Sequence, residues 1–162
     1  MAKEFASLRE FLMYFERKLA LQKSKEVKAL ELSAKLLQTA AKEKFGVYQA
    51  AIGDYPRWAP LDQSTREQRV RLGYSADEPL YRDGSLLKDS IQKTVDPIKM
   101  EAVVGSTEQV MVYQEMGTST IPPRPVLGPT GLENEKIILD IFRKTIMSTF
   151  GVRQINAEAQ HD

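Results

Sequence analysis

The residue types that usually carry catalysis are sparse in this sequence, and their spacing is unfavourable. The only histidine, His161, is the penultimate residue, where a general base has no fixed orientation. There are no cysteines, and no Walker loop, dinucleotide fingerprint or H-E-x-x-H pattern occurs. Ser85 and Ser90 have no base nearby in the sequence, and Asp83 and Asp89 have no third acid or histidine at metal-ligand spacing. We therefore expect no enzyme, no cofactor and no metal, and a site assembled from distant carboxylates is the one catalytic alternative.

A different chemistry, recognition by shape and charge, is concentrated in residues 112–129. Four of the eight prolines lie between Pro122 and Pro129, and each one fixes φ near about −65° and removes a backbone donor. The segment is therefore neither a helix interior nor a central strand, and it forms a stiff frame that leads into the last helix. Arg124 on this frame carries five N–H donors, and Glu115 is the nearest acceptor in the sequence. We predict that Arg124 and Glu115 pair, within one chain or between neighbours, and that Gly117 takes a left-handed turn before them.

Two plainer interpretations of the same segment remain open. It is either a packed proline-rich loop or, from Pro122 to Pro125, a P-x-x-P ligand for an aromatic groove. Apolar residues on both sides favour packing over a free-standing ligand.

Basic residues gather in one other stretch of the chain. The stretch is formed by four arginines, Arg57, Arg66, Arg69 and Arg71. They predict either a patch that contacts an acidic partner or DNA, or a solvated helix face, and the solvated face is the preferred interpretation.

The composition is that of an ordinary soluble protein. The chain has 162 residues, of which 42% are hydrophobic and 28% charged, and 23 basic residues against 22 acidic ones give a net charge of +1. This balance supplies no global reason to bind nucleic acid. No leader pattern and no apolar run of membrane-spanning length is present, so we expect synthesis in a cytoplasm and no membrane partner. We predict one α+β domain over residues 1–151, followed by a polar tail over residues 152–162.

The N-terminal third predicts one long amphipathic helix. Apolar residues recur at helical spacing from Phe5 to Ala41, and no proline or glycine occurs before Gly46. A helix over residues 3–45 is about 60 Å long, more than a domain of this size can cover, so part of it should project. The polar residues 22–25 mark a bend or a break into two helices. A projecting helix pairs either with its own chain or with a neighbouring subunit.

The middle of the chain predicts loops and short helices. Trp58, flanked by prolines, is expected to anchor its loop on the core together with Leu61. Ser64 and Glu67 form a capping-box pattern for a short helix that Gly73 closes. Asp83 or Ser85 is expected to cap a further short helix whose apolar side contains Leu86, Leu87 and Ile91.

The second half predicts a small antiparallel sheet and a last helix. Strands are expected over residues 91–95 and 98–104, and residues 110–113 fit either a strand or a helix. A sheet of about three or four strands needs a covering helix, which a Thr130–Glu133 capping box opens and Gly151 ends. The apolar arc of that helix is wide, which indicates a second contact with the long helix or another subunit.

Three blocks of this chain resemble the tail-completion and virion-morphogenesis proteins of tailed phages, the lambda Z-type and Mu G-like family. The most specific block is Tyr-Gln-Glu-Met-Gly-Thr at residues 113–118 followed by Ile-Pro-Pro-Arg-Pro-Val-Leu-Gly-Pro at residues 121–129. The blocks around Trp58 and over residues 79–91 are similar to other family segments. The sequence departs from the family at Met116 and Val126, which replace aromatic residues, and at Asp83, which replaces a threonine. The candidate assembly residues on this block are Tyr113, Glu115, Gly117, Ile121, Pro123, Arg124, Pro125 and Leu127.

The resemblance implies an α+β structural protein of the phage neck. Such proteins complete the tail end and join it to the head as a ring of about six copies. The implied partners are the tail tube or terminator and the head connector, with DNA only as the passing genome, in the virion and in the host cytoplasm during assembly. A tail terminator or other neck protein, and a soluble adaptor for a peptide or nucleic acid, are the alternatives.

Overall fold

The computed structural model describes residues 5–80 and 86–150, and its central element is the long helix α1, Leu8–Glu43. The side chain of Ser7 caps this helix by accepting from the Glu10 N–H at 3.2 Å, and Glu10 in turn accepts from the Ala6 N–H. The chain leaves the helix at Gly46, whose φ is 88°. Since α1 is one element, the predicted long helix is confirmed and the two-helix alternative is wrong.

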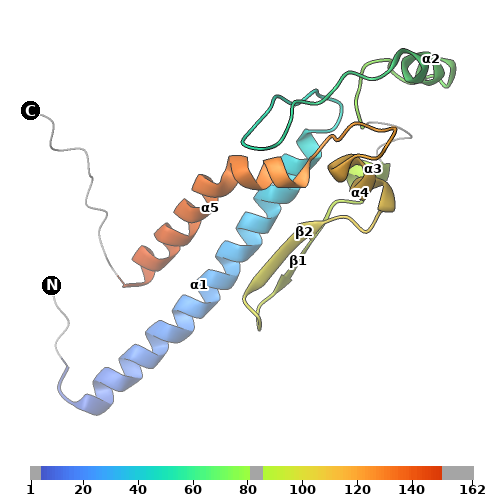
Figure 1. Ribbon diagram of the computed structural model, residues 1–162. Helices are drawn as coiled ribbons and strands as arrows, with labels where there is room; N and C mark the ends of the chain where they lie inside the picture. Colours follow the sequence, from blue (N-terminus) through green and yellow to red (C-terminus); the bar gives the residue numbers. More distant parts are fainter. Residues whose placement is uncertain (1–4, 81–85, 151–162) are drawn as a thin grey trace, which may run out of the picture.

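The last helix, α5, spans Leu127–Phe150 and packs antiparallel to α1 (Figure 1). Lys44 at the end of α1 is almost buried and contacts Glu133 near the start of α5, with Nζ to Oε2 at 2.7 Å. At the other end, Lys18 Nζ donates to the Thr149 carbonyl at 2.9 Å. A cation there complements the negative end of the α5 dipole. The helix begins at Leu127, earlier than the Thr130–Glu133 pattern predicts. Glu133 pairs with Lys44 instead of capping the helix, and the first N–H groups of α5 are capped by Glu115.

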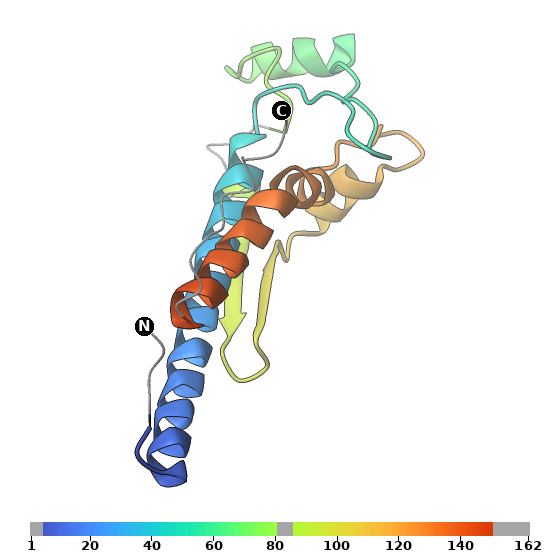
Figure 2. The ribbon, with the colours of Figure 1, turned by 90° about the vertical axis from the view of Figure 1, so that its left-hand side faces the viewer.

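The sheet is a two-stranded antiparallel hairpin of β1, Gln92–Asp96, and β2, Glu101–Gly105. Gln92 pairs with Gly105 and Asp96 with Glu101. Asp96 Oδ1 closes the turn by accepting from the N–H groups of Ile98 and Lys99 at 2.9 and 3.0 Å. The α+β class is confirmed, but the described part of the chain has two strands where about three or four were predicted. An isolated hairpin is marginal, and this one is supported by packing on α1 (Figure 2).

The predicted third strand is a helix, α4, over Gln109–Met116. Met111 is 2% exposed, and Gln114 and Glu115 follow it at helical spacing on the same side. Val110 and Val112, whose alternation fitted a strand, are both about half exposed. The helix places Met111 in the core and Glu115 at the start of α5.

Two shorter helices complete the chain, α2 over Gln63–Arg71 and α3 over Leu86–Asp89. The N-cap of α2 is Asp62, which accepts from the Ser64 N–H at 3.2 Å, in place of the predicted Ser64–Glu67 box. Hydrogen bonds from Ser64 lower the pKa of Asp62. Gly73, with φ of 82°, ends α2 as predicted. The predicted caps Asp83 and Ser85, His161 and the tail over residues 152–162 lie outside the described residues.

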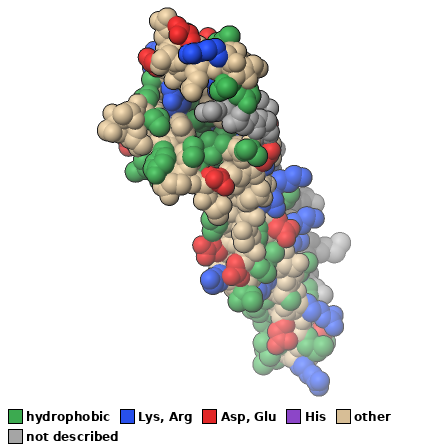
Figure 3. All heavy atoms as spheres, turned by 90° about the vertical axis from the view of Figure 1, so that its right-hand side faces the viewer, with side chains coloured by type: hydrophobic (Ala, Val, Ile, Leu, Met, Phe, Trp, Pro, Cys, Tyr) green, Lys and Arg blue, Asp and Glu red, His purple; other side chains and the backbone are tan. Residues whose placement is uncertain are grey.

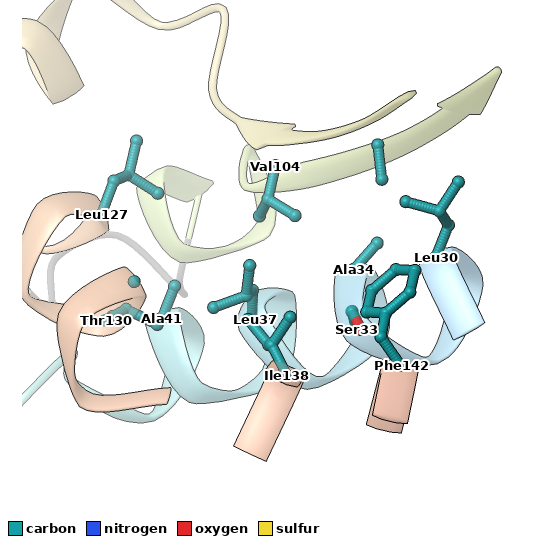
Figure 4. A pocket seen from close by; sticks show the side chains of 12 residues that line it. Leu30, Ser33, Ala34, Leu37, Ala41, Val104, Leu127, Thr130, Ile138 and Phe142 are labelled. Carbon is teal, nitrogen blue, oxygen red and sulfur yellow. The ribbon is translucent and has the colours of Figure 1, made fainter. Parts of the chain in front are cut away.

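The core lies where the C-terminal half of α1 meets the loops, the hairpin and the start of α5. Its buried members are Ala41, Phe45, Trp58, Ile91, Met111 and Val126. Beside it, α1, β2 and α5 border an apolar groove of about 250 Å³, into which Leu37, Val104 and Ile138 point (Figure 4). The helix α5 and the hairpin thus pack on neighbouring parts of α1, on either side of this groove.

Candidate assembly site

The segment after α4 turns sharply at Gly117 and folds back along the helix. Gly117 has φ 75° and ψ 173°, a region that is essentially restricted to glycine. A Cβ at this position would lie 3.0 Å from Pro123 Cδ and 3.1 Å from the Ile121 carbonyl oxygen. The Thr118 N–H donates to the Ile121 carbonyl at 2.8 Å, and the Arg124 N–H donates to the Gln114 carbonyl at 2.6 Å. The proline run is therefore a packed return loop.

Glu115 on α4 caps the N-terminus of α5. One carboxylate oxygen accepts from the N–H groups of Val126 and Leu127 at 2.7 and 3.1 Å, and the other accepts from Gly128 at 2.9 Å. The first turn of a helix leaves its N–H groups without internal partners and carries the positive end of the helix dipole. A carboxylate supplies both the acceptors and the opposite charge, so Glu115 fixes α4 to α5.

Arg124 and its neighbour Pro125 join this return loop to the Trp58 loop. Arg124 is 5% exposed, and its Nη2 donates to the carbonyls of Ala59 and Pro60 at 3.1 and 3.3 Å. Burial lowers the pKa of the Arg124 guanidinium, and the two carbonyls partly replace its lost hydration. Trp58 is 3% exposed, and its Nε1 donates to the Pro125 carbonyl at 3.1 Å. We call residues 113–128 together with residues 56–61 the corner.

The predicted Arg124–Glu115 pair is wrong within the chain. Glu115 is taken up by three N–H groups of α5, and Arg124 by two carbonyls of the Trp58 loop. Sequence reasoning chose Glu115 because it was the nearest acid. It missed that unpaired N–H groups of a helix starting at Leu127 compete for the same carboxylate.

The corner buries some of the motif residues and exposes others. Pro125 and Val126 are buried, as is Arg124, while Ile121, Pro123 and Leu127 are partly buried. Tyr113 is 44% exposed and Met116 77%. Because Pro125 is buried, the P-x-x-P segment is not presented as a free-standing ligand.

The four arginines of the predicted basic patch are divided between different contacts. Arg66 pairs with Asp77 at 3.0 Å, and Arg69, which is 7% exposed, donates from Nε to the Ser75 carbonyl at 2.7 Å. Arg57 and Arg71 are exposed. Leu61 lies with Arg69 and Arg124 along a pocket of about 550 Å³. Arg57 and Arg66 line one pocket, whereas Arg69 is buried, so the four arginines do not share one environment.

No group of three or more potential metal-ligating side chains occurs among residues 5–80 and 86–150. None of the helices in that part of the chain has the length and apolar character of a membrane span.

Comparison with known proteins finds a similarity in sequence to a phage protein. The chain is 28% identical over 109 residues to the Mu-like prophage FluMu G protein 1 of Haemophilus influenzae. The matched region covers 66% of this chain and 72% of that protein. No protein-family model matches the chain, and no solved structure matches it. The similarity relates the chain to a phage protein.

Proposed function

We propose that this chain is a structural protein of a tailed-phage particle that completes the tail end and joins the tail to the head as a ring of copies. The observation that carries the proposal is the signature over residues 113–129, in a chain that is similar to a Mu-like prophage protein. The proposed partners are other copies of the chain, the tail tube or terminator, and the head connector. The proposed location is the neck of the virion, with assembly in the host cytoplasm.

The geometry of the corner supports a mechanical role for the signature. Glu115 connects α4 with the start of α5, and Arg124 connects the return loop with the Trp58 loop. Gly117 allows the close return of the loop between them. The Glu115 carboxylate and Arg124 Nη2 find their partners within the chain, and these contacts support a stiff junction. The proposal assigns these residues a positioning role and assigns the chain no chemical reaction.

The shape of the molecule supports assembly through contacts with other copies. The N-terminal part of α1 extends beyond α5 and the hairpin (Figures 1 and 2). Large apolar side chains on that extension are 42–73% exposed. Exposed apolar surface on this scale is typical of sites that another protein covers.

The test uses phage particles made with and without the chain. In its absence, we expect filled heads and separate tails of normal length, and addition of the purified protein should restore joined particles seen by electron microscopy. A tail terminator would instead produce tails of abnormal length. Joined, infectious particles formed equally well without the chain would contradict the proposal.

A further inference from the structure

The N-terminal part of α1 continues beyond the reach of its own partner helix. Lys18 Nζ contacts the carbonyl of Thr149, and Lys25 Nζ contacts Ser148 Oγ, so the last turns of α5 lie beside this part of α1. Residues 8–21, which we call the tip, lie beside the last turn of α5 at Lys18 and extend from there past the end of that helix (Figure 2). Figure 3 shows hydrophobic side chains among charged ones along this extension.

The tip repeats the face of α1 that receives α5 in the body of the molecule. Leu12 precedes Leu30 by 18 residues and Leu19 precedes Leu37 by the same interval, which is about five helical turns. Leu30 and Leu37 line the groove with Phe142 of α5 (Figure 4). Leu12 and Leu19 are 49% and 48% exposed. The tip is therefore a continuation of the α1 face that packs on α5, and no second helix covers it within residues 5–80 and 86–150.

Aromatic contacts order the tip before any partner binds. The ring of Phe5 lies 5.3 Å from that of Phe11 and 5.1 Å from that of Tyr14, and Phe11 stacks on Phe15 at 6.0 Å. Preordered aromatic side chains lose little conformational entropy on binding, and they are enriched among residues that dominate interface energies.

The exposed apolar area of the tip is large enough for a specific contact. Five large apolar side chains on one face contribute: Leu8, Phe11, Leu12, Phe15 and Leu19. With each exposing roughly half of about 150–250 Å², they present on the order of 500 Å². A standard interface buries about 800 Å² on each partner, so the tip can supply more than half of one side of an interface.

The helix α5 carries a second apolar stripe that the described part of the chain covers only in part, with Leu132 at its start lying close to Gly53 of a loop in the same chain. Ile138 and Phe142 line the groove beside α1, whereas Leu132, Leu139 and Ile146 are 45%, 55% and 47% exposed. These three residues, which we call the outer stripe, are spaced by seven positions, the heptad interval of helices that pack side by side. The stripe is about 21 Å long and the stretch from Leu8 to Leu19 about 16 Å, so their lengths are compatible.

We propose that the tip of one copy packs on the outer stripe of α5 of a second copy. Most of the tip lies beyond the last described turn of α5, while the stripe runs along α5 beside the face that packs on α1, so among the described residues of one chain the two surfaces do not meet. A contact between two different surfaces is heterologous, and copies joined this way form a ring if the rotation closes. Ring closure rests on the proposed function, whereas the pairwise contact can be tested by itself.

The first test exploits the absence of cysteine from the sequence. The variants Leu12→Cys and Leu139→Cys are purified separately, mixed and treated with a short bismaleimide. A dimer-sized product is expected in the mixture, and neither variant alone should give one. Arg17→Cys, on the opposite face of the tip, is the matched control and should give no product with Leu139→Cys. A product from Leu12→Cys alone would identify a tip-to-tip contact and overturn the proposal, as would no product in the mixture.

The second test disables each surface in turn. Leu12→Glu with Phe15→Glu, and separately Leu139→Glu, should keep the circular-dichroism spectrum while weakening self-association at least tenfold in light scattering. Mixing the two disabled variants leaves one intact tip and one intact stripe, so dimers and nothing larger should form. Arg17→Glu should assemble like the unmodified chain.

The outcomes separate this contact from the proposed function. Rings that persist in both disabled variants would overturn the tip–stripe contact and leave the ring intact. Failure of head–tail joining to depend on the chain would overturn the function, while the pairwise crosslink would still be observed. Binding of the tip to lipid vesicles, lost in the same variants and without self-association, would also overturn the proposal.

Discussion

The corner and the tip both carry large apolar side chains, but only the corner has its polar and apolar groups packed within the chain. In the corner, Trp58, Glu115 and Arg124 find partners within the chain, at distances of 2.7–3.3 Å. In the tip, Leu12 and its neighbours stand about half exposed on a face that is covered elsewhere on the same helix. The difference indicates that the motif-bearing segment builds the shape of the molecule, and that the segment without a motif is available for assembly.

Truncation of the tryptophan should separate the two regions most strongly. Trp58→Ala removes a side chain that is 3% exposed, and we expect a loss of about 3–5 kcal/mol in the free energy of unfolding. Trp58→Phe keeps most of the packing and loses the hydrogen bond to Pro125, for a loss of about 1–2 kcal/mol. Urea unfolding followed by circular dichroism measures both. Equal losses in the two variants would mean that packing is not what Trp58 contributes.

Removal of the carboxylate cap should follow. Glu115→Ala leaves three N–H groups at the start of α5 without their acceptor, and we expect a loss of about 2–4 kcal/mol. Glu108→Ala is the matched control, since the Glu108 side chain makes no cap hydrogen bond, and its effect should stay within about 0.5 kcal/mol. The same urea titration measures both variants. Similar losses in the free energy of unfolding would contradict the role of Glu115 as the cap of α5.

The glycine at the end of α4 should have a somewhat smaller effect. Gly117→Ala places a methyl group 3.0 Å from Pro123 Cδ in a backbone region that favours glycine, at a cost of about 2–3 kcal/mol. Gly131→Ala in α5, where nothing lies within 4 Å of the new Cβ, should instead stabilise by about 0.5–1 kcal/mol. Thermal unfolding of both variants gives the comparison, and an unchanged Gly117→Ala protein would contradict the close return of the loop.

The tip should show the smallest effect on the fold. At a concentration where the chain is monomeric, Leu12→Gln should change the free energy of unfolding by no more than about 0.5 kcal/mol, because Leu12 is half exposed. A loss as large as that of Glu115→Ala would mean that the tip stabilises the fold of its own chain, and it would contradict the difference between the tip and the corner.

Local patterns predicted the long helix, because its period and its lack of proline and glycine depend only on neighbouring residues. The same reasoning predicted the hairpin near residues 91–104 and the end of α2 at Gly73. It failed where a partner distant in sequence decided the outcome. The segment 110–113 lies in the helix α4 and buries Met111, whereas the predicted strand used the alternation of Val110 and Val112.

The candidate site shows the same limit. The residues of the signature were found by type and spacing, but their partners were not. Arg124 binds carbonyls 64 and 65 positions away, and carbonyls carry no sequence signal. Glu115 caps α5, whose start at Leu127 was not predicted because it lies within the proline-rich segment.

The most direct test of the central claim is an electron-microscopic map of the head–tail junction that resolves side chains. We expect each copy to bury Leu12 and Phe15 against Leu139 of its neighbour, while Glu115 and Arg124 keep their partners within one chain. A map in which the tip lies in solvent and residues 113–129 form the contact between copies would contradict it.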